Sequence, residues 1–120
     1  MHYSDSHEWV KVTNSTATVG VSQYAQKELG DIVHIELPKV GAAVKKGQEI
    51  VVLESTKAAA DVYCPVSGEV AEVNRELVDH PELINESPED TGWLVRITLK
   101  DPTELESLMD QETYEKTISN

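Results

Sequence analysis

Short runs in which apolar and polar residues alternate recur along the chain, and small or polar residues separate them. An alternation with a period of two predicts strands rather than long helices. Residues 9–13 and 16–21 are two such runs, and the pair between them, Asn14-Ser15, is typical of a turn. We therefore expect the chain to open with a β-hairpin.

A short helix is expected next, near residues 22–29. Ser22 occupies an N-cap position and Gly30 follows the segment as a C-terminal stop. Loops are expected at 40–47 and 87–92, and a short helical turn within 75–85. The remaining strands are predicted at Asp31–Leu37, Ile50–Leu53, Val62–Cys64, Glu69–Asn74 and Trp93–Leu99.

One lysine, Lys57, lies in a bend between two apolar runs. The runs are Ile50–Leu53 and Val62–Cys64, and the bend is built from small residues that leave the lysine amine uncrowded. The bend lacks the Asn-Gly or Gly-x pair of a two-residue hairpin turn. A wider bend across Ser55–Ala58 is therefore expected, with Lys57 pointing into solvent.

The C-terminal part of the chain has a different, helical pattern. Asp101 is suited to cap a helix that has Pro102 at its first position and Glu104 at its third. A second short helix is expected through Tyr114, so helices are predicted near residues 102–116. One helical face would carry Leu105, Leu108 and Met109, and both helices are expected to pack against the β core.

Two parts of the sequence are similar to each other. The segment that starts Gly30-Asp-Ile-Val resembles the one that starts Gly68-Glu-Val-Ala, and Glu49–Leu53 resembles Trp93–Ile97. Each half thus offers one strand opened by glycine and an acid, then a later apolar strand. The expected fold is mainly β, a flattened sandwich or barrel of two pseudo-symmetric halves with the Lys57 bend at their junction.

The charge balance argues against several classes of partner. The chain has 120 residues, with 10 Lys and Arg against 22 Asp and Glu, which gives a net charge of −12. Such a field repels phosphate backbones and anionic lipid surfaces, so neither a nucleic-acid nor a membrane partner is expected. The length suits one domain with its own core, and a single domain is expected over residues 1–120.

Catalytic and metal-binding patterns find little support. No nucleophile elbow, Walker motif or dinucleotide fingerprint occurs, and the four histidines do not share a ligand spacing. The one cysteine, Cys64, lies in an apolar run and is expected to be a buried, inert side chain. The first residues show no secretory or transit pattern, so a cytoplasmic location is expected.

A set of motifs in the order of the chain resembles the H protein of the glycine cleavage system, from about Tyr3 to Tyr114. Each motif is short, but their order and separation make the resemblance specific. The motifs are Ser6-His-Glu-Trp-Val10, Ala17-Thr-Val-Gly20, Leu29-Gly-Asp-Ile-Val33, Glu36-Leu-Pro38, Glu54-Ser-Thr-Lys-Ala58, Pro65-Val-Ser-Gly-Glu-Val70, Val73-Asn74, Pro81-Glu-Leu-Ile-Asn85 and Gly92-Trp-Leu94.

The resemblance implies a fold and a function. The fold is that of lipoyl and biotinyl domains, here with a core over residues 3–100 and a C-terminal helical segment over 101–117. The function is that of a non-catalytic, monomeric lipoyl carrier with lipoic acid on Lys57. The motif around Lys57 (Glu54, Ser55, Thr56 and Ala58) would present it to a lipoate ligase or a lipoyl or octanoyl transferase.

The same resemblance implies a set of partner enzymes. The arm would take the aminomethyl group of glycine from the pyridoxal-phosphate-dependent glycine decarboxylase (P protein). It would pass that group to the aminomethyltransferase (T protein), and dihydrolipoyl dehydrogenase (L protein) would reoxidise the arm. The family shelters the loaded arm in a cleft, which implies roles for Ser6, Glu8 and Asp61, since carboxylates and a hydroxyl suit a protonated amine.

Two departures from the family pattern and two alternatives accompany this interpretation. Thr56 stands where the family usually has valine, and Cys64 where a smaller residue is common. An H-like protein that donates lipoyl groups to other complexes would also carry lipoic acid on Lys57. A biotin carrier is less consistent, because such domains usually have methionine beside the acceptor lysine, whereas Lys57 lies between Thr56 and Ala58.

Overall fold

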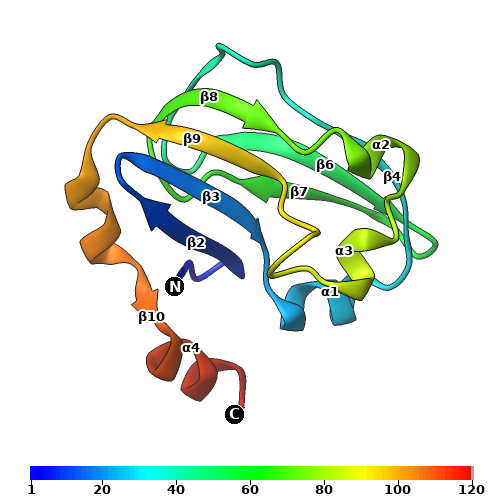
Figure 1. Cartoon of the computed structure of the whole chain (residues 1–120). Helices are drawn as coiled ribbons and strands as arrows, with labels where there is room; N and C mark the ends of the chain where they lie inside the picture. Colours follow the sequence, from blue (N-terminus) through cyan, green and yellow to red (C-terminus); the bar gives the residue numbers. More distant parts are fainter. Residues whose placement is uncertain (120) are drawn as a thin grey trace.

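Two antiparallel sheets enclose the apolar core in the computed structural model, which describes residues 1–119 (Figure 1). The larger sheet has seven strands in the order β10-β1-β2-β3-β9-β8-β5, and the smaller has three in the order β4-β6-β7. The strands are β1 (His2–Tyr3), β2 (Glu8–Thr13), β3 (Thr16–Val21), β4 (Ile32–Glu36), β5 (Ala43–Val44), β6 (Glu49–Ser55), β7 (Ala59–Tyr63), β8 (Gly68–Val73), β9 (Val95–Leu99) and β10 (Met109–Asp110).

The helices are short and lie at the ends of the strands. They are α1 (Gln23–Leu29), α2 (Glu76–Asp79), α3 (Leu83–Glu86), a 3-10 helix over Pro102–Ser107 and α4 (Gln111–Ile118). Within residues 1–119, none of these helices is long and apolar enough to cross a membrane.

The predicted opening hairpin and first helix are confirmed. β2 and β3 pair from Glu8 opposite Val21 to Thr13 opposite Thr16, which leaves the predicted two-residue turn. Ser22 caps α1 by accepting a hydrogen bond from the Ala25 backbone at 3.1 Å. α1 ends where predicted because Gly30 has a φ of 83°, a backbone conformation that favours glycine.

The similarity between the two halves of the sequence reappears as similar strand pairs. β4 pairs with β6 in the small sheet and β8 pairs with β9 in the large one, both antiparallel. Each pair carries one register irregularity, between Ile32 and His34 in one and between Val70 and Glu72 in the other. The prediction of a flattened barrel-sandwich fold is confirmed, and the chain forms it from two antiparallel sheets.

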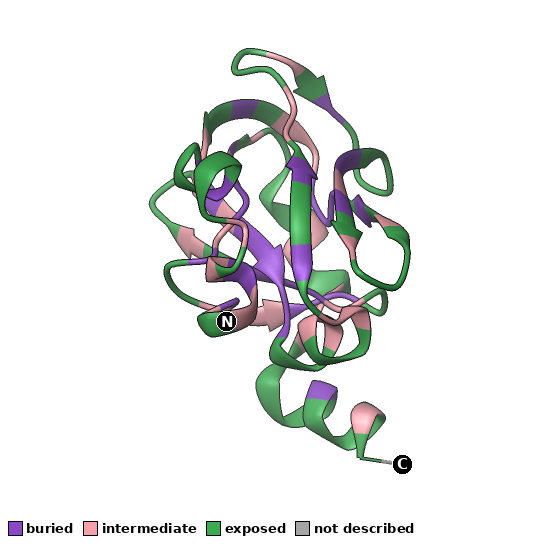
Figure 2. Cartoon of the chain, turned by 90° about the vertical axis from the view of Figure 1, so that its right-hand side faces the viewer, coloured by how far each residue is buried: buried purple, intermediate pink, exposed green. Residues whose placement is uncertain are grey.

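The core lies between the sheets, and Figure 2 shows the buried residues in purple, mostly on strands in the middle of the molecule. In β3 the buried side chains Ala17 and Val19 alternate with the half-buried Thr16 and Thr18, which is the period of a strand, and the strand ends in the buried pair Gly20 and Val21. Gly68 starts β8 where a Cβ would lie 1.9 Å from the Thr98 carbonyl oxygen, so no side chain fits there.

The C-terminal part differs from the prediction. The segment 102–107 is a 3-10 helix, and Leu108 and Met109 lie outside it, so the predicted single face of Leu105, Leu108 and Met109 does not form. Leu105 and Leu108 pack on the main core, whereas Met109 belongs to a second cluster around Tyr3, Trp9 and Tyr114. The chain turns into β10 because β1 offers it an antiparallel partner.

Candidate functional site

Lys57 lies in a four-residue bend between β6 and β7. Glu54 pairs with Ala59, and the Ser55 backbone donates to the Ala58 carbonyl at 2.9 Å. The Ser55 hydroxyl also accepts from the backbones of Lys57 and Ala58, both at 3.1 Å. The predicted wide bend over Ser55–Ala58 is confirmed, and Lys57 is exposed within it.

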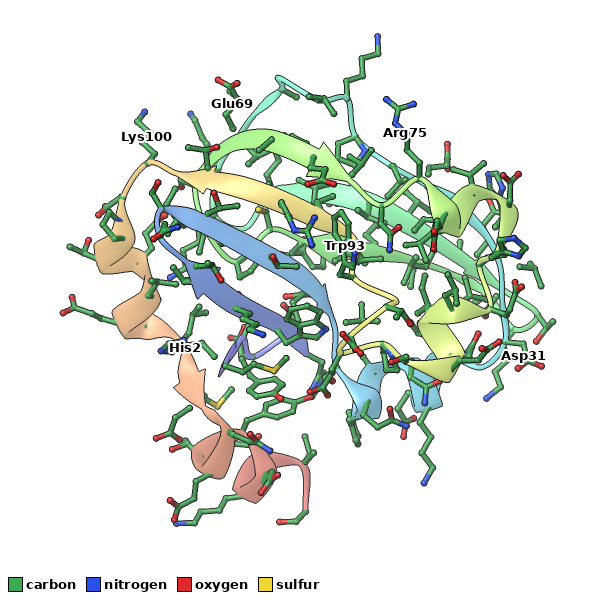
Figure 3. The ribbon with its side chains drawn as sticks, viewed as in Figure 1. His2, Asp31, Glu69, Arg75, Trp93 and Lys100 are labelled. Carbon is green, nitrogen blue, oxygen red and sulfur yellow. The ribbon has the colours of Figure 1, made fainter. Side chains whose placement is uncertain are left out.

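The bend rests on the corner between α1 and β4. The Thr56 backbone donates to the Asp31 carbonyl at 3.0 Å, and Figure 3 shows Asp31 at this end of the molecule. The methylene groups of Lys57 lie over Gly30, since a Cβ on Gly30 would be 3.2 Å from Lys57 Cε. The base of Lys57 is therefore directed along the end of α1.

α1 connects the region of Lys57 to a buried carboxylate. Its first turn follows Val21, which pairs with Glu8, and the Ser22 backbone donates to the His7 carbonyl at 2.9 Å. Its last residue precedes Gly30, on which Lys57 lies. Seven helical residues at 1.5 Å each span about 10 Å, so a group attached to Lys57 must bridge about this length to approach Glu8.

The carboxylate of Glu8 is 3% exposed and has two hydroxyl donors on one oxygen. Ser4 Oγ donates to Oε1 at 2.5 Å and Ser6 Oγ donates to the same atom at 2.6 Å. Burial raises the pKa of Glu8, and hydrogen bonds from Ser4, Ser6 and the Tyr63 backbone act in the opposite direction. A cation beside Glu8 would favour its charged form.

A hollow of about 320 Å³ runs between α1 and β7 and brings together the three predicted cleft residues. Ser6, Glu8 and Asp61 all line it, although they come from three separate parts of the chain: the loop before β2, β2 and β7. Val21, Leu29 and Val62 are among the apolar side chains in its wall, which also includes His7, Tyr24 and Glu28. Lys57 does not line this hollow but lies beyond the end of α1.

A second hollow, of about 310 Å³, also contains Ser6 and Glu8 in its wall. It is lined on its other sides by Lys46, Cys64 and Met109, among others. Cys64 is buried as predicted, its thiol donates to the Val66 carbonyl at 3.0 Å, and burial raises its pKa to about 11. The thiol therefore stays protonated and unreactive near neutral pH.

Tyr114 of α4 ties the C-terminal helix to the loop that carries Ser6 and Glu8. Its hydroxyl lies 2.8 Å from His7 Nδ1 and 2.6 Å from Ser22 Oγ. Its ring stacks on Tyr3 with centroids 4.3 Å apart. His7 has a φ of 72°, and this backbone conformation is held by the neighbours of its side chain and carbonyl.

Lys57, Ser6, Glu8 and Asp61 were proposed as site residues from the sequence, but the groups that hold them were not singled out. Ser4 was not singled out, although it is buried and bonds the Glu8 carboxylate. Residue spacing gave no signal for Ser4, because residues 5–7 form a turn that brings Ser4 back to Glu8. Across residues 1–119, no three His, Cys, Asp or Glu side chains gather in a metal-binding arrangement.

Comparison with known proteins gives one consistent result. The family model described as glycine cleavage H-protein matches residues 1–120. The glycine cleavage system H protein of Halothermothrix orenii is 55% identical over 112 residues, which cover 93% of this chain and 88% of that protein. The H protein of Thermotoga maritima is 49% identical over 114 residues, covering 95% of this chain and 92% of that protein.

A solved structure has the same fold. The crystal structure of a glycine cleavage system H protein from Mycobacterium marinum matches with a TM-score of 0.91 and 30% sequence identity. The match covers 99% of this chain and 96% of that chain.

Proposed function

Because the chain belongs to the glycine cleavage H-protein family, whose members are the lipoyl carriers of the glycine cleavage system, we propose that Lys57 is its point of lipoyl attachment. One observation carries this proposal: Lys57 is exposed in a pinned bend and leans over Gly30 toward α1. At the other end of α1 lies the buried carboxylate of Glu8. The chain acts as a carrier and leaves catalysis to its partners.

The residues present fit a lipoyl group. Small neighbours leave the Lys57 amine open to an acylating enzyme, and the hollow beside α1 has apolar walls suited to a methylene chain. When bound, the dithiolane supplies a redox-active sulfur that carries the aminomethyl group of glycine. Glu8, Ser6 and Asp61 supply acceptors at the hollow for a protonated amine.

Glu8 performs the central electrostatic role in this proposal. Burial raises its pKa, which means that the ionised carboxylate is destabilised, and a cation in the hollow would stabilise this ionised form. A protonated amine held there is also sheltered from water by the walls of α1 and β7. Ser4 and Ser6 both bond Oε1 and so fix the orientation of the carboxylate.

The partners follow from the family and extend the proposal. Glycine decarboxylase (P protein) loads the carrier, the aminomethyltransferase (T protein) unloads it and dihydrolipoyl dehydrogenase (L protein) reoxidises it. A lipoate ligase or a lipoyl or octanoyl transferase acylates Lys57. The acidic surface, with 22 Asp and Glu against 10 Lys and Arg, suits docking to basic faces of these enzymes.

The attachment is tested by acylation of Lys57→Arg, which keeps the charge but removes the primary amine. Lipoate ligase is expected to add one lipoyl group to the wild type and to Lys39→Arg, a matched control at another exposed lysine, and none to Lys57→Arg. Intact mass reports the result. Modification of Lys57→Arg would contradict the assignment of the site.

The carrier role is tested by reconstitution with P protein, glycine and labelled bicarbonate. Carboxyl exchange is expected with the lipoylated wild type. If Lys57 is lipoylated but supports no exchange, the glycine cleavage role fails and a lipoyl donor for other complexes becomes the better explanation.

The role of Glu8 is tested on the loaded protein. Removing a hydrogen bond to a charged group costs about 1.5–3 kcal/mol, so Glu8→Ala is expected to lose its aminomethyl cargo to water about 10- to 100-fold faster. Glu69→Ala, which removes an exposed carboxylate on β8, is the control. Equal rates of loss in all three proteins would remove Glu8 from the mechanism.

A further inference from the structure

Gly30 is in direct contact with the lysine that we propose to be modified. A Cβ on Gly30 would lie 3.2 Å from Cε and 3.4 Å from Cδ of Lys57, closer than ordinary van der Waals contact. Gly30 also has a φ of 83° and a ψ of −163°, a combination that only glycine adopts readily. The lysine stem therefore occupies space that any other residue would fill.

Side chains and backbone groups on two sides hold this glycine in place. Asn85 Nδ2 donates to the Gly30 carbonyl at 2.8 Å, and Asn85 Oδ1 accepts from the Ile32 backbone at 2.9 Å. From the other side, the Thr56 backbone donates to the Asp31 carbonyl at 3.0 Å. The bend that carries Lys57 and the end of α1 are thus fixed relative to each other.

The direction of the lysine stem decides where an attached group begins. Lys57 is exposed in a bend and could point away from the protein in many rotamers, because its stem has four rotatable bonds. In the structure the Lys57 stem adopts a conformation that lies across Gly30 at the end of α1. From this end, the hollow between α1 and β7 leads to Glu8.

We propose that Gly30 is a positioning residue for the lipoyl arm: its missing side chain lets the Lys57 stem lie on the end of α1, so that an attached lipoyl group starts at the mouth of the hollow. This inference rests on the proposed lipoylation of Lys57. It adds that two features direct the arm into the hollow. One is the Gly30 surface under the Lys57 stem, and the other is the pair of carboxylates, Glu8 and Asp61, in the wall of the hollow.

The first test uses the unmodified wild-type protein. Nuclear Overhauser contacts are expected between the Gly30 α-protons and the Lys57 δ- and ε-methylene protons, because one α-proton points along the direction in which a Cβ would lie 3.2 Å from Lys57 Cε. Their absence would overturn the inference whatever the state of lipoylation. This measurement requires no variant and does not depend on whether a substituted protein folds.

The second test compares two glycine variants in their lipoylated forms. Gly30→Ala and Gly41→Ala both place alanine at a positive φ, at 83° and 93°, but a Cβ on Gly41 meets no atom within 4 Å. Both variants are expected to melt about 3–8 °C below the wild type. Only Gly30→Ala is expected to redirect the lysine.

Amide chemical shifts report where the arm lies. Attachment of lipoic acid to the wild type and to Gly41→Ala is expected to shift the amides of α1 and of residues 6–8, and in Gly30→Ala these shifts should fall to less than half. Equal shifts in both variants would overturn the positioning role while leaving the proposed function intact. Failure of Lys57 to accept lipoic acid would instead overturn the proposed function.

Asn85→Ala provides a variant without backbone strain. It removes the hydrogen bonds to the Gly30 carbonyl, the Ile32 backbone and Gln26 Oε1 but changes no positive-φ residue. The same amide shifts are expected to weaken in this variant, because the corner is no longer held against the bend. Unchanged shifts would contradict the claim that a fixed Gly30 corner directs the arm.

Discussion

Ser4→Ala removes a hydroxyl that holds both the carboxylate and the backbone N–H of Glu8. The Ser4 hydroxyl donates to Glu8 Oε1 at 2.5 Å and accepts from the Glu8 backbone at 2.9 Å, and both residues are buried. The variant therefore leaves a buried N–H without its partner and the carboxylate with one hydroxyl donor, Ser6, instead of two. The backbone hydrogen bonds between residues 4 and 8 remain.

The loss of stability is expected to depend on pH. An unpaired buried N–H costs about 1–3 kcal/mol at any pH, and a lost hydrogen bond to a charged group costs about 1.5–3 kcal/mol when Glu8 is ionised. Together the two costs are about 2.5–6 kcal/mol where Glu8 is ionised. At pH 5 a larger fraction of Glu8 is neutral than at pH 8, because burial raises its pKa, so the second cost is smaller there.

The change in the Glu8 pKa predicts the same pH dependence for the loss of stability in Ser4→Ala. Ser4 lowers the pKa of Glu8, so its removal raises that pKa further. A carboxyl with a raised pKa in the folded state binds protons there that the unfolded chain has released. This proton binding stabilises the folded state fully at pH values below the pKa of the unfolded carboxyl. The stabilisation is lost as pH rises through the raised pKa of the folded state.

Urea unfolding at pH 5 and pH 8 measures both contributions. The wild type, Ser4→Ala and Ser6→Ala are compared, and each serine variant is repeated in a Glu8→Gln background. The pH dependence of the Ser4→Ala effect is expected to disappear with glutamine. Ser6→Ala is expected to cost less, since Ser6 is exposed and it is Ser4 that accepts from the buried Glu8 backbone. An equal Ser4→Ala effect at the two pH values would refute the assigned link to the Glu8 charge.

Two further substitutions test the scaffold around the site. Gly68→Ala is expected to lower the free energy of unfolding by more than about 3 kcal/mol, because the new Cβ would lie 1.9 Å from the Thr98 carbonyl oxygen. Urea unfolding measures this loss, and a loss no larger than that of Gly41→Ala would contradict the close approach. Tyr114→Phe keeps the ring stacked on Tyr3 but removes the hydroxyl beside His7 and Ser22, so a loss of about 1–2 kcal/mol is expected. In the same variant, the His7 amide signal should shift in NMR spectra, and an unchanged signal would show that the hydroxyl does not hold this loop.

The elements nearest Lys57 were predictable because their signals are local. The strands around the bend, the Ser22 cap and the Gly30 stop each depend on residues within one or two turns of chain. The resemblance to a family then supplied roles for Ser6, Glu8 and Asp61, which the structure gathers around one hollow from separate elements. Residue spacing alone would not have paired Glu8 with Asp61.

The features that sequence reasoning missed depend on contacts between distant segments. Two-residue strands such as β1 and β10 are too short for a periodic pattern, and they pair across more than 100 residues of chain. The prediction of one helical face for Leu105, Leu108 and Met109 was wrong because the helix ends at Ser107 and the chain becomes a strand. Burial of Glu8 was equally hidden, since glutamate is usually a surface residue.

The two borders of the large sheet affect how the molecule meets other proteins. Its outermost strands, β10 and β5, are both two residues long, so each offers very few backbone groups to an approaching chain. Long, flat borders are where sheets join one another and aggregate. A carrier must bind several enzymes in turn and dissociate from each of them. Edge strands as short as β10 and β5 offer little backbone for pairing, so recognition there depends on side chains and charge. Such contacts permit brief, reversible binding and discourage self-association of the large sheet.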